Sequence, residues 1–245
     1  MVGRHAKNRG KCLVDDYVLS LLEEVHLDLV QNKLMELASL WELVSRPNKR
    51  RFYDLYGQIA SLITVEVDDS LIRAAIQFLD PSYRCFTFNR EGLMPTTEEY
   101  SMLIRLNLQC PDKVYYRRTR LGVCKKLAKI MGIEPIDADG YLVNKRGTIE
   151  LKWVFLRDFI NIHINEDRGL VTLALSIYGL VIFPRVIRHV EVIVINFFEE
   201  VQNHANPSLA IVAETIRSLN IFRKKSDERF MGCLPMLYVS LRSHF

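Results

Sequence analysis

Apolar residues recur three and four positions apart through most of this chain, and this helical spacing constrains the fold more than any other feature. The first run with the spacing consists of Leu27, Val30, Leu34, Leu37, Trp41 and Val44. It has the pattern of a coiled-coil seam, but it is shorter than the roughly three to four heptads that such a seam sustains. We therefore expect an amphipathic helix that packs inside its own domain, with a partner helix as the open alternative.

Further helices are expected after Pro47, which ends the first one. Asp68 and Asp69 mark the start of one helix, and Asn206 followed by Pro207 marks another. The expected helical segments cover about 52–63, 69–79, 121–130, 150–162, 169–183, 187–203, 207–222 and 230–245. Among them, the apolar run Leu170–Phe183 stops after about 14 residues, short of the roughly 18 that a membrane span needs. We interpret it as a buried core helix and expect no membrane partner.

Only one segment has the alternation of a strand. Residues 83–88 read YRCFTF, with Phe86 and Phe88 on one side, and a turn and a short return strand follow. This predicts a small β-hairpin at about 84–94. The stretch 132–149, which is rich in Gly and Asp, is expected to be an internal loop. The fold class predicted is mainly α: a multi-helix globular domain with one small hairpin.

Two adjacent glutamates, Glu98 and Glu99, raise the question of a catalytic carboxylate pair. Adjacent residues on a helix point about 100° apart, so the two side chains do not face a common substrate. Thr96 and Glu99 have instead the spacing of a capping box, in which each side chain satisfies the other's backbone N–H. We interpret PTTEEY as a helix start, with Tyr100, Leu103 and Ile104 turned inward.

Composition and motifs exclude several kinds of chemistry. The five cysteines are scattered without a CxxC pair, which predicts reduced thiols rather than a disulfide framework or a zinc module. The histidines form no HExxH set, and the eleven glycines form neither GxGxxG nor GxxxxGK[ST]. Lysines next to Cys124 are able to lower its pKa, but we expect an inert surface thiol. We predict no enzyme, no cofactor and no metal, with a site assembled from distant residues as an open alternative.

A basic segment is the main candidate for binding. It contains no acidic residue before Glu134, and Tyr115 and Tyr116 accompany the cations, as in phosphate-contacting surfaces with stacking aromatics. Its members are Lys113, Arg117, Arg118, Arg120, Lys125, Lys126 and Lys129. The alternatives are nucleic-acid contact, an acidic partner protein, or a solvated face that docks on carboxylates of the same chain. Smaller basic clusters at 48–51 and 223–225 either serve nuclear import or simply lie at helix ends.

The chain resembles the plant mobile domain-like proteins, and more closely a plant-specific branch found in retroelement-associated reading frames. Four stretches carry the resemblance in the same order: 71–88 (LIRAAIQFLDPSYRCFTF), 95–106 (PTTEEYSMLIRL), 173–185 (LALSIYGLVIFPR) and 209–220 (LAIVAETIRSLN). The resemblance implies an α-rich, transposon-associated domain, nuclear rather than cytoplasmic. It also implies roles in transposon silencing or genome maintenance and phosphatase-like protein partners. The family's "aminotransferase-like" label brings no catalytic motif onto this sequence, and we infer no pyridoxal phosphate.

These expectations combine into one prediction. Residues 1–14 form a basic N-terminal tail, and 15–245 form a single helical domain, truncated at its C-terminus because the family's members continue past the position of Phe245. The predicted function is a non-enzymatic interaction module of a transposon-associated protein. A nucleic-acid-binding protein that uses the 113–129 segment is the first alternative.

Overall fold

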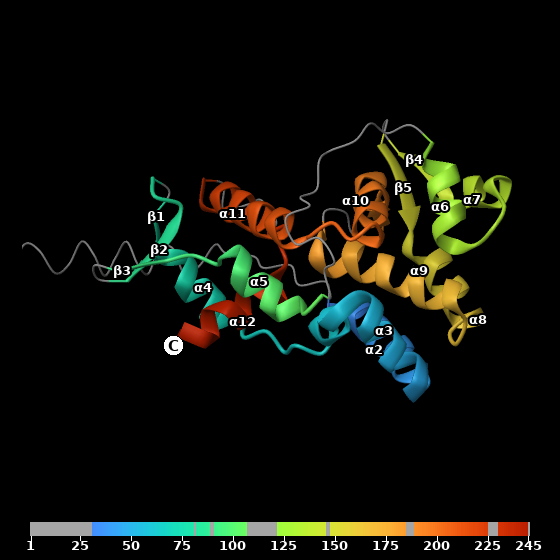
Figure 1. The fold of residues 1–245 in the computed structure, drawn as a ribbon. Coiled ribbons are helices and arrows are strands. Elements are labelled where there is room, and N and C mark those ends of the chain that lie inside the picture. Colours follow the sequence, from blue (N-terminus) through green and yellow to red (C-terminus); the bar gives the residue numbers. More distant parts are fainter. Residues whose placement is uncertain are drawn as a thin grey trace, which may run out of the picture.

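The computed structural model describes residues 31–80, 82–88, 91–106, 122–145, 148–184, 189–224 and 230–244, and within them the fold is mainly α-helical, as predicted (Figure 1). The expected tail at 1–14 and the seam residues Leu27 and Val30 lie outside the described residues. The helices, in chain order, are α2 (Gln31–Leu43), α3 (Arg46–Tyr56), the 3₁₀ helix η1 (Gly57–Ile63), α4 (Asp69–Gln77), α5 (Thr97–Ile104), α6 (Val123–Met131), α7 (Pro135–Tyr141), α8 (Trp153–Ile162), α9 (Asp167–Ile177), the π-helix η2 (Tyr178–Ile182), α10 (Val192–Gln202), α11 (Ser208–Lys224) and α12 (Leu234–His244).

The first described helices, α2 and α3, pack into the core of the domain. Leu37 and Trp41 are buried on α2, and the Trp41 ring meets Phe52 of α3 edge-on with 5.0 Å between ring centroids. α3 follows an extended Ser45 and carries Pro47 in its first turn, where the missing N–H needs no helical partner. The break expected near Pro47 is therefore confirmed, and the seam residues Leu37, Trp41 and Val44 are buried within the chain itself.

The hairpin expected at 84–94 is confirmed as part of a three-stranded antiparallel sheet. Its strands are β1 (Leu79–Asp80), β2 (Cys85–Phe88) and β3 (Glu91–Leu93). Phe86 of the middle strand is fully buried. Leu79, which the helical spacing placed at the end of α4, is instead a strand residue opposite Phe86. Pairing with β2 ends the helix at Gln77, so tertiary contacts override the local periodicity there.

A second antiparallel sheet was not predicted. It consists of β4 (Leu142–Lys145), β5 (Thr148–Lys152) and β6 (His189–Glu191). The expected loop at 132–149 is wrong, because α7 and β4 lie in it, and the helices expected from 150 and 187 begin only after their strands. Leu151 pairs with Val190, and both side chains are fully buried. Whether a segment forms a strand depends on such pairing partners. The spacing of neighbouring residues does not contain this information, and by itself it indicated a helix.

The predicted capping box at the start of α5 is confirmed. Glu99 N donates to Thr96 Oγ1 at 3.2 Å, and Thr96 N donates to Glu99 Oε2 at 3.1 Å. Tyr100 and Ile104 are buried as expected, whereas Leu103 is only partly buried. The two bonds satisfy backbone donors that the first turn of a helix leaves without partners. Glu99 is therefore a helix-start residue, as its spacing indicated.

The apolar run Leu170–Phe183 forms α9 and η2, and every residue from 170 to 182 is buried. The prediction of a core helix is confirmed. Gly169 allows the tight turn from α8 into α9, because a Cβ there would overlap the carbonyl oxygen of His163. Within the described residues, none of the helices combines the length and the apolar character needed to cross a bilayer.

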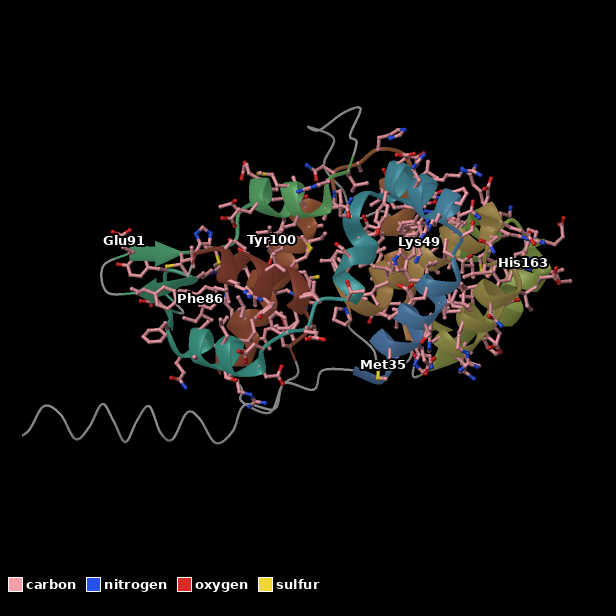
Figure 2. All side chains as sticks on the ribbon, turned by 90° about the horizontal axis from the view of Figure 1, so that it is seen from below. Met35, Lys49, Phe86, Glu91, Tyr100 and His163 are labelled. Atoms are coloured by element: carbon pink, nitrogen blue, oxygen red, sulfur yellow. The ribbon has the colours of Figure 1, made fainter. Side chains whose placement is uncertain are left out.

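Two apolar clusters form the interior. The larger is built mainly from α2, α3, η1, α6 and α8–α10, and the smaller joins α4 and the first sheet to α11 and α12. Figure 1 shows the first sheet with α4, α5 and α12 in one half of the molecule and the second sheet with α6–α10 in the other. Figure 2 shows Phe86 and Tyr100 in the first half, and Lys49 and His163 in the second.

Candidate binding pocket

A surface pocket of about 340 Å³ lies between α3, α6 and α9, and we call it the α3–α6–α9 pocket. This volume is near the lower end of the roughly 300–1,000 Å³ range of ligand pockets. Three cations, one carboxylate and several apolar side chains surround it. The lining residues are Arg51, Leu55, Tyr56, Lys129, Ile130, Gly132, Asp167, Arg168, Leu170, Val171 and Gln202.

The first turn of α9 is fixed to α3 by polar contacts at the α8–α9 turn. Ser45 N donates to Asn165 Oδ1 at 3.0 Å, and Asn48 Nδ2 donates to the carbonyl oxygen of Asn165 at 2.9 Å. On the other side, α6 ends at Gly132, whose φ of 63° is left-handed and suits glycine. Arg51, Lys129 and Arg168 thus line one opening, although they come from three separate stretches of sequence.

The aromatic base of the pocket is rigid. Tyr56 is buried at the end of α3, and its ring stacks on Phe198 with 5.9 Å between centroids. Burial raises the pKa of Tyr56 to about 12, and a hydrogen bond with Gln202 opposes part of that rise. The phenol therefore stays neutral across the physiological range and provides a fixed polar group beside apolar walls.

Carboxylates neutralise two of the three cations. Arg51 Nη2 donates to Asp167 Oδ2 at 2.8 Å, and Nη1 contacts the second oxygen of the same carboxylate. Arg168 Nε donates to Glu166 Oε2 at 2.7 Å. Hydrogen bonds from His163 and Arg168 lower the pKa of Glu166, which keeps this carboxylate charged. Lys129 is exposed, and no carboxylate of the described residues pairs with it. The pocket is thus left with one net positive charge.

The structure separates the basic residues that the sequence grouped together. Lys113, Arg117, Arg118 and Arg120 lie outside the described residues. Lys126 turns inward, where its ammonium group lies 2.8 Å from Glu199 Oε2 and donates to Asn196 Oδ1 at 2.8 Å. It docks on a carboxylate of the same chain, which is one of the alternatives left open. Lys125 is exposed to solvent, and Lys129 lines the pocket.

In the sequence, Arg51 belongs to a small basic cluster at a helix end, and neither Tyr56 nor Arg168 is distinguished as a site residue. One signal was available for Arg51. Arg46, Lys49, Arg50 and Arg51 lie in the first half of α3, whose first turn holds no acidic residue. Cations there oppose the helix dipole, so this arrangement is not one that helix stability favours. Tyr56 and Arg168 have no comparable signal in the sequence.

Among the residues that the structure describes, the other candidates for chemistry do not form a site. Cys124 Sγ donates to Asp139 Oδ1 at 3.3 Å, and burial together with this carboxylate raises the pKa of the thiol. The neighbouring lysines therefore do not activate it. The described cysteines, Cys85, Cys124 and Cys233, are free thiols. Across the described ranges, His, Cys, Asp and Glu side chains nowhere gather in groups of three or more that could hold a metal ion.

Comparison with protein families gives one match, which covers residues 37–245 and therefore nearly all of the described fold. Neither the curated proteins nor the solved structures gave a match. The α3–α6–α9 pocket and both apolar clusters lie inside the matched range. Because the match spans most of the chain, the protein belongs to the family described as a domain of unknown function, DUF7745.

Proposed function

We propose that this protein is a non-enzymatic interaction module that binds an acidic segment of a partner protein in the α3–α6–α9 pocket. One observation carries the proposal: two basic stretches far apart in sequence meet at the same pocket, where Arg51 is paired with Asp167 and Lys129 is exposed without a carboxylate partner among the described residues. Apolar walls beside them offer burial as well as charge. Such a mixed lining suits a peptide with acidic and apolar side chains.

The charges at the start of α3 support the same proposal. Arg46, Arg50 and Arg51 are exposed on the first half of this helix, and Arg46 lies in the first turn, where the helix dipole favours anions. Repulsion among these cations and with the dipole is relieved when an anionic partner approaches. Residues that oppose local stability often have a role in binding. Here Arg46 and Arg50 add exposed positive charge on α3 outside the lining of the pocket.

The biological setting that we propose comes from the sequence resemblance to plant mobile domain-like proteins. In this setting the module belongs to a transposon-associated plant protein that acts in the nucleus, in transposon silencing or genome maintenance, with a phosphatase-like protein as its partner. Imaging of a fluorescently tagged full chain in plant cells tests the nuclear part. Exclusion of the tagged protein from nuclei would contradict it.

A second candidate function is nucleic-acid binding along the basic segment. Lys125 and Lys129 are both exposed on α6, one helical turn apart, and in the sequence they follow the basic residues at 113–120. A strand of phosphates that follows this segment would contact both lysines. The peptide proposal differs, because it requires Lys129 at the pocket and does not involve Lys125, which is not part of the lining.

Charge reversal of these two lysines separates the two functions. Fluorescence anisotropy is measured with a labelled glutamate- and leucine-rich peptide and with labelled DNA and RNA, each across a salt series. We expect Lys129→Glu to weaken peptide binding roughly tenfold or more, and Lys125→Glu to leave it within about twofold. Equal losses for both variants together with salt-dependent DNA or RNA binding would favour the second function. No binding of any acidic peptide would overturn the proposal.

A further inference from the structure

The charge balance of the pocket defines the ligand group more narrowly. We infer that the pocket binds a single carboxylate adjacent to an aliphatic side chain, with Lys129 as the partner of that carboxylate. This inference rests on the proposed function and specifies which chemical group of the partner enters the pocket. It depends on three features: which cations are already paired, what the walls consist of, and where α9 begins.

Both arginines already have a carboxylate partner in the structure. Both guanidinium N–H groups of Arg51 that face Asp167 are engaged, in the two-pronged geometry that guanidinium and carboxylate groups prefer. Arg168 is bound to Glu166, which also contacts His163. A ligand that reached the remaining N–H groups of either arginine would share that cation with a carboxylate already in place. Lys129 shares its charge with no carboxylate of the described residues, so we take it as the main partner of the ligand.

A dianionic phosphate is disfavoured for the same reason. Beyond Lys129, its second charge would find only arginines that already share their charge with carboxylates, and it would lie close to the carboxylate of Asp167. Like charges at short range repel, and a phosphate recognition site normally offers two or more free cations. A carboxylate matches the single net charge of the pocket. The first turn of α9 lies on the rim and adds a weak preference for an anion.

The walls select an aliphatic neighbour for this carboxylate. Leu55 is 55% exposed at the mouth, while Ile130, Leu170 and Val171 are buried. An acidic group alone would leave Leu55 in water, whereas an aliphatic side chain beside it would cover this residue. The small volume favours compact side chains such as Leu or Val over a ring system. The preferred ligand is therefore an acidic peptide in which Glu or Asp accompanies Leu or Val.

Matched synthetic peptides test the inference. Four short peptides share one sequence except at two positions, which carry Leu with Glu, Leu with Gln, Leu with phosphoserine, or Ala with Glu. Affinities are measured by isothermal titration calorimetry with the wild-type chain and with Lys129→Met, Lys125→Met and Asp167→Asn. Circular dichroism of each variant checks that the fold is retained.

We expect the peptide with Leu and Glu to bind tightest to the wild-type protein, roughly tenfold tighter than the one with Gln. Lys129→Met should remove this difference, and Lys125→Met should preserve it. Asp167→Asn frees Arg51, so it should improve binding of the phosphoserine peptide about tenfold relative to the glutamate peptide.

Two results overturn the inference and spare the proposed function: tighter binding of phosphoserine by the wild-type chain, or equal binding of the Leu and Ala peptides. Absence of binding by all four peptides overturns both.

Discussion

The imidazole Nε2 of His244 lies 2.8 Å from Oε1 of Glu99, so the end of α12 is fixed to the start of α5. The other oxygen of Glu99 accepts from Thr96 N and, at 3.2 Å, from Ser240 Oγ. One carboxylate thus completes a capping box and joins two helices that are far apart in the sequence. This relationship gives Glu99 a structural role that its neighbour Glu98 does not share.

Substitution of the two glutamates distinguishes these roles. Glu99→Ala should lower the free energy of unfolding by about 1–2 kcal/mol, because it removes the cap and the bonds to α12. Glu98→Ala removes an exposed carboxylate from the same helical turn and should change stability by no more than about 0.5 kcal/mol. Urea denaturation followed by circular dichroism measures both values. Equal effects of the two substitutions would contradict the assignment.

The same carboxylate predicts a pH dependence. Burial alone would raise the pKa of Glu99, but hydrogen bonds with Thr96, His244 and Ser240 outweigh it and lower the pKa below the ordinary 4.5. A carboxyl whose pKa is lower in the folded state stabilises the fold above its unfolded pKa, and this contribution disappears as the pH falls through the folded pKa. The stability difference between wild type and Glu99→Gln should therefore be constant near neutral pH and shrink below about pH 4.5. A difference that grows in acid would show the opposite sign.

Gly57 should be intolerant of a side chain. Its φ of 61° with ψ of −149° is a conformation that residues with a Cβ rarely adopt, and a Cβ there would overlap the carbonyl oxygen of Ile104. We expect Gly57→Ala to destabilise the protein by at least about 2 kcal/mol. The control is Gly140→Ala on α7, where a Cβ meets no atom within 4 Å. This control should stabilise by about 0.4–1 kcal/mol. Thermal denaturation compares the two.

Removal of the Tyr178 hydroxyl should not lower the stability of the fold. It is fully buried, burial raises its pKa, and its oxygen has no hydrogen-bond partner among the described residues. Since a buried hydroxyl without a partner costs about 1–3 kcal/mol, Tyr178→Phe should leave the fold equally stable or raise the free energy of unfolding by about 1 kcal/mol. Tyr56→Phe, which loses a hydrogen bond with Gln202, should lower it instead. A marked loss of stability in Tyr178→Phe would reveal a partner for the hydroxyl.

Substitution of Lys126 and Lys125 tests whether the first has a structural role that the second lacks. Lys126→Met leaves Glu199 and Asn196 without their cation at a partly buried contact between α6 and α10. We expect a loss of about 1–3 kcal/mol in the free energy of unfolding. Lys125→Met changes the same charge on the exposed side of α6 and should stay within about 0.5 kcal/mol. Similar small effects for both lysines would mean that Lys126 is not part of the structural core.

The features that were predicted well from the sequence depend on residues that are close together along the chain. The cap of α5 needs only Thr96 and Glu99, and the first hairpin needs only a short alternating run and a turn. The burial of α9 and η2 follows from an apolar run too short for a membrane. In each case the partners of a residue lie within a few positions of it, so local spacing carries the information.

The features that sequence missed depend on partners far along the chain. β5 looks helical until β6 supplies its hydrogen bonds, because Leu151 and Val190 are both apolar and give no sign of their pairing. The α3–α6–α9 pocket likewise depends on residues that are far apart in the sequence. Lys129 was a candidate, but only the fold shows that Lys126 is already paired and that Asp167 neutralises Arg51. A count of charges along the sequence could not distinguish the paired Lys126 from Lys129 at the pocket.

The division of the interior into two clusters has a consequence for synthesis of the chain. All but two residues of the larger cluster lie between Leu37 and Val212, so most of it can assemble before α12 has left the ribosome. The smaller cluster cannot, because Ile72 and Phe86 are covered by residues between Leu219 and Leu241. The part of the smaller cluster on α4 and the first sheet therefore leaves the ribosome early. Its apolar surface stays uncovered until α12 is released. During that interval α4 and the first sheet are the segments most in need of a chaperone.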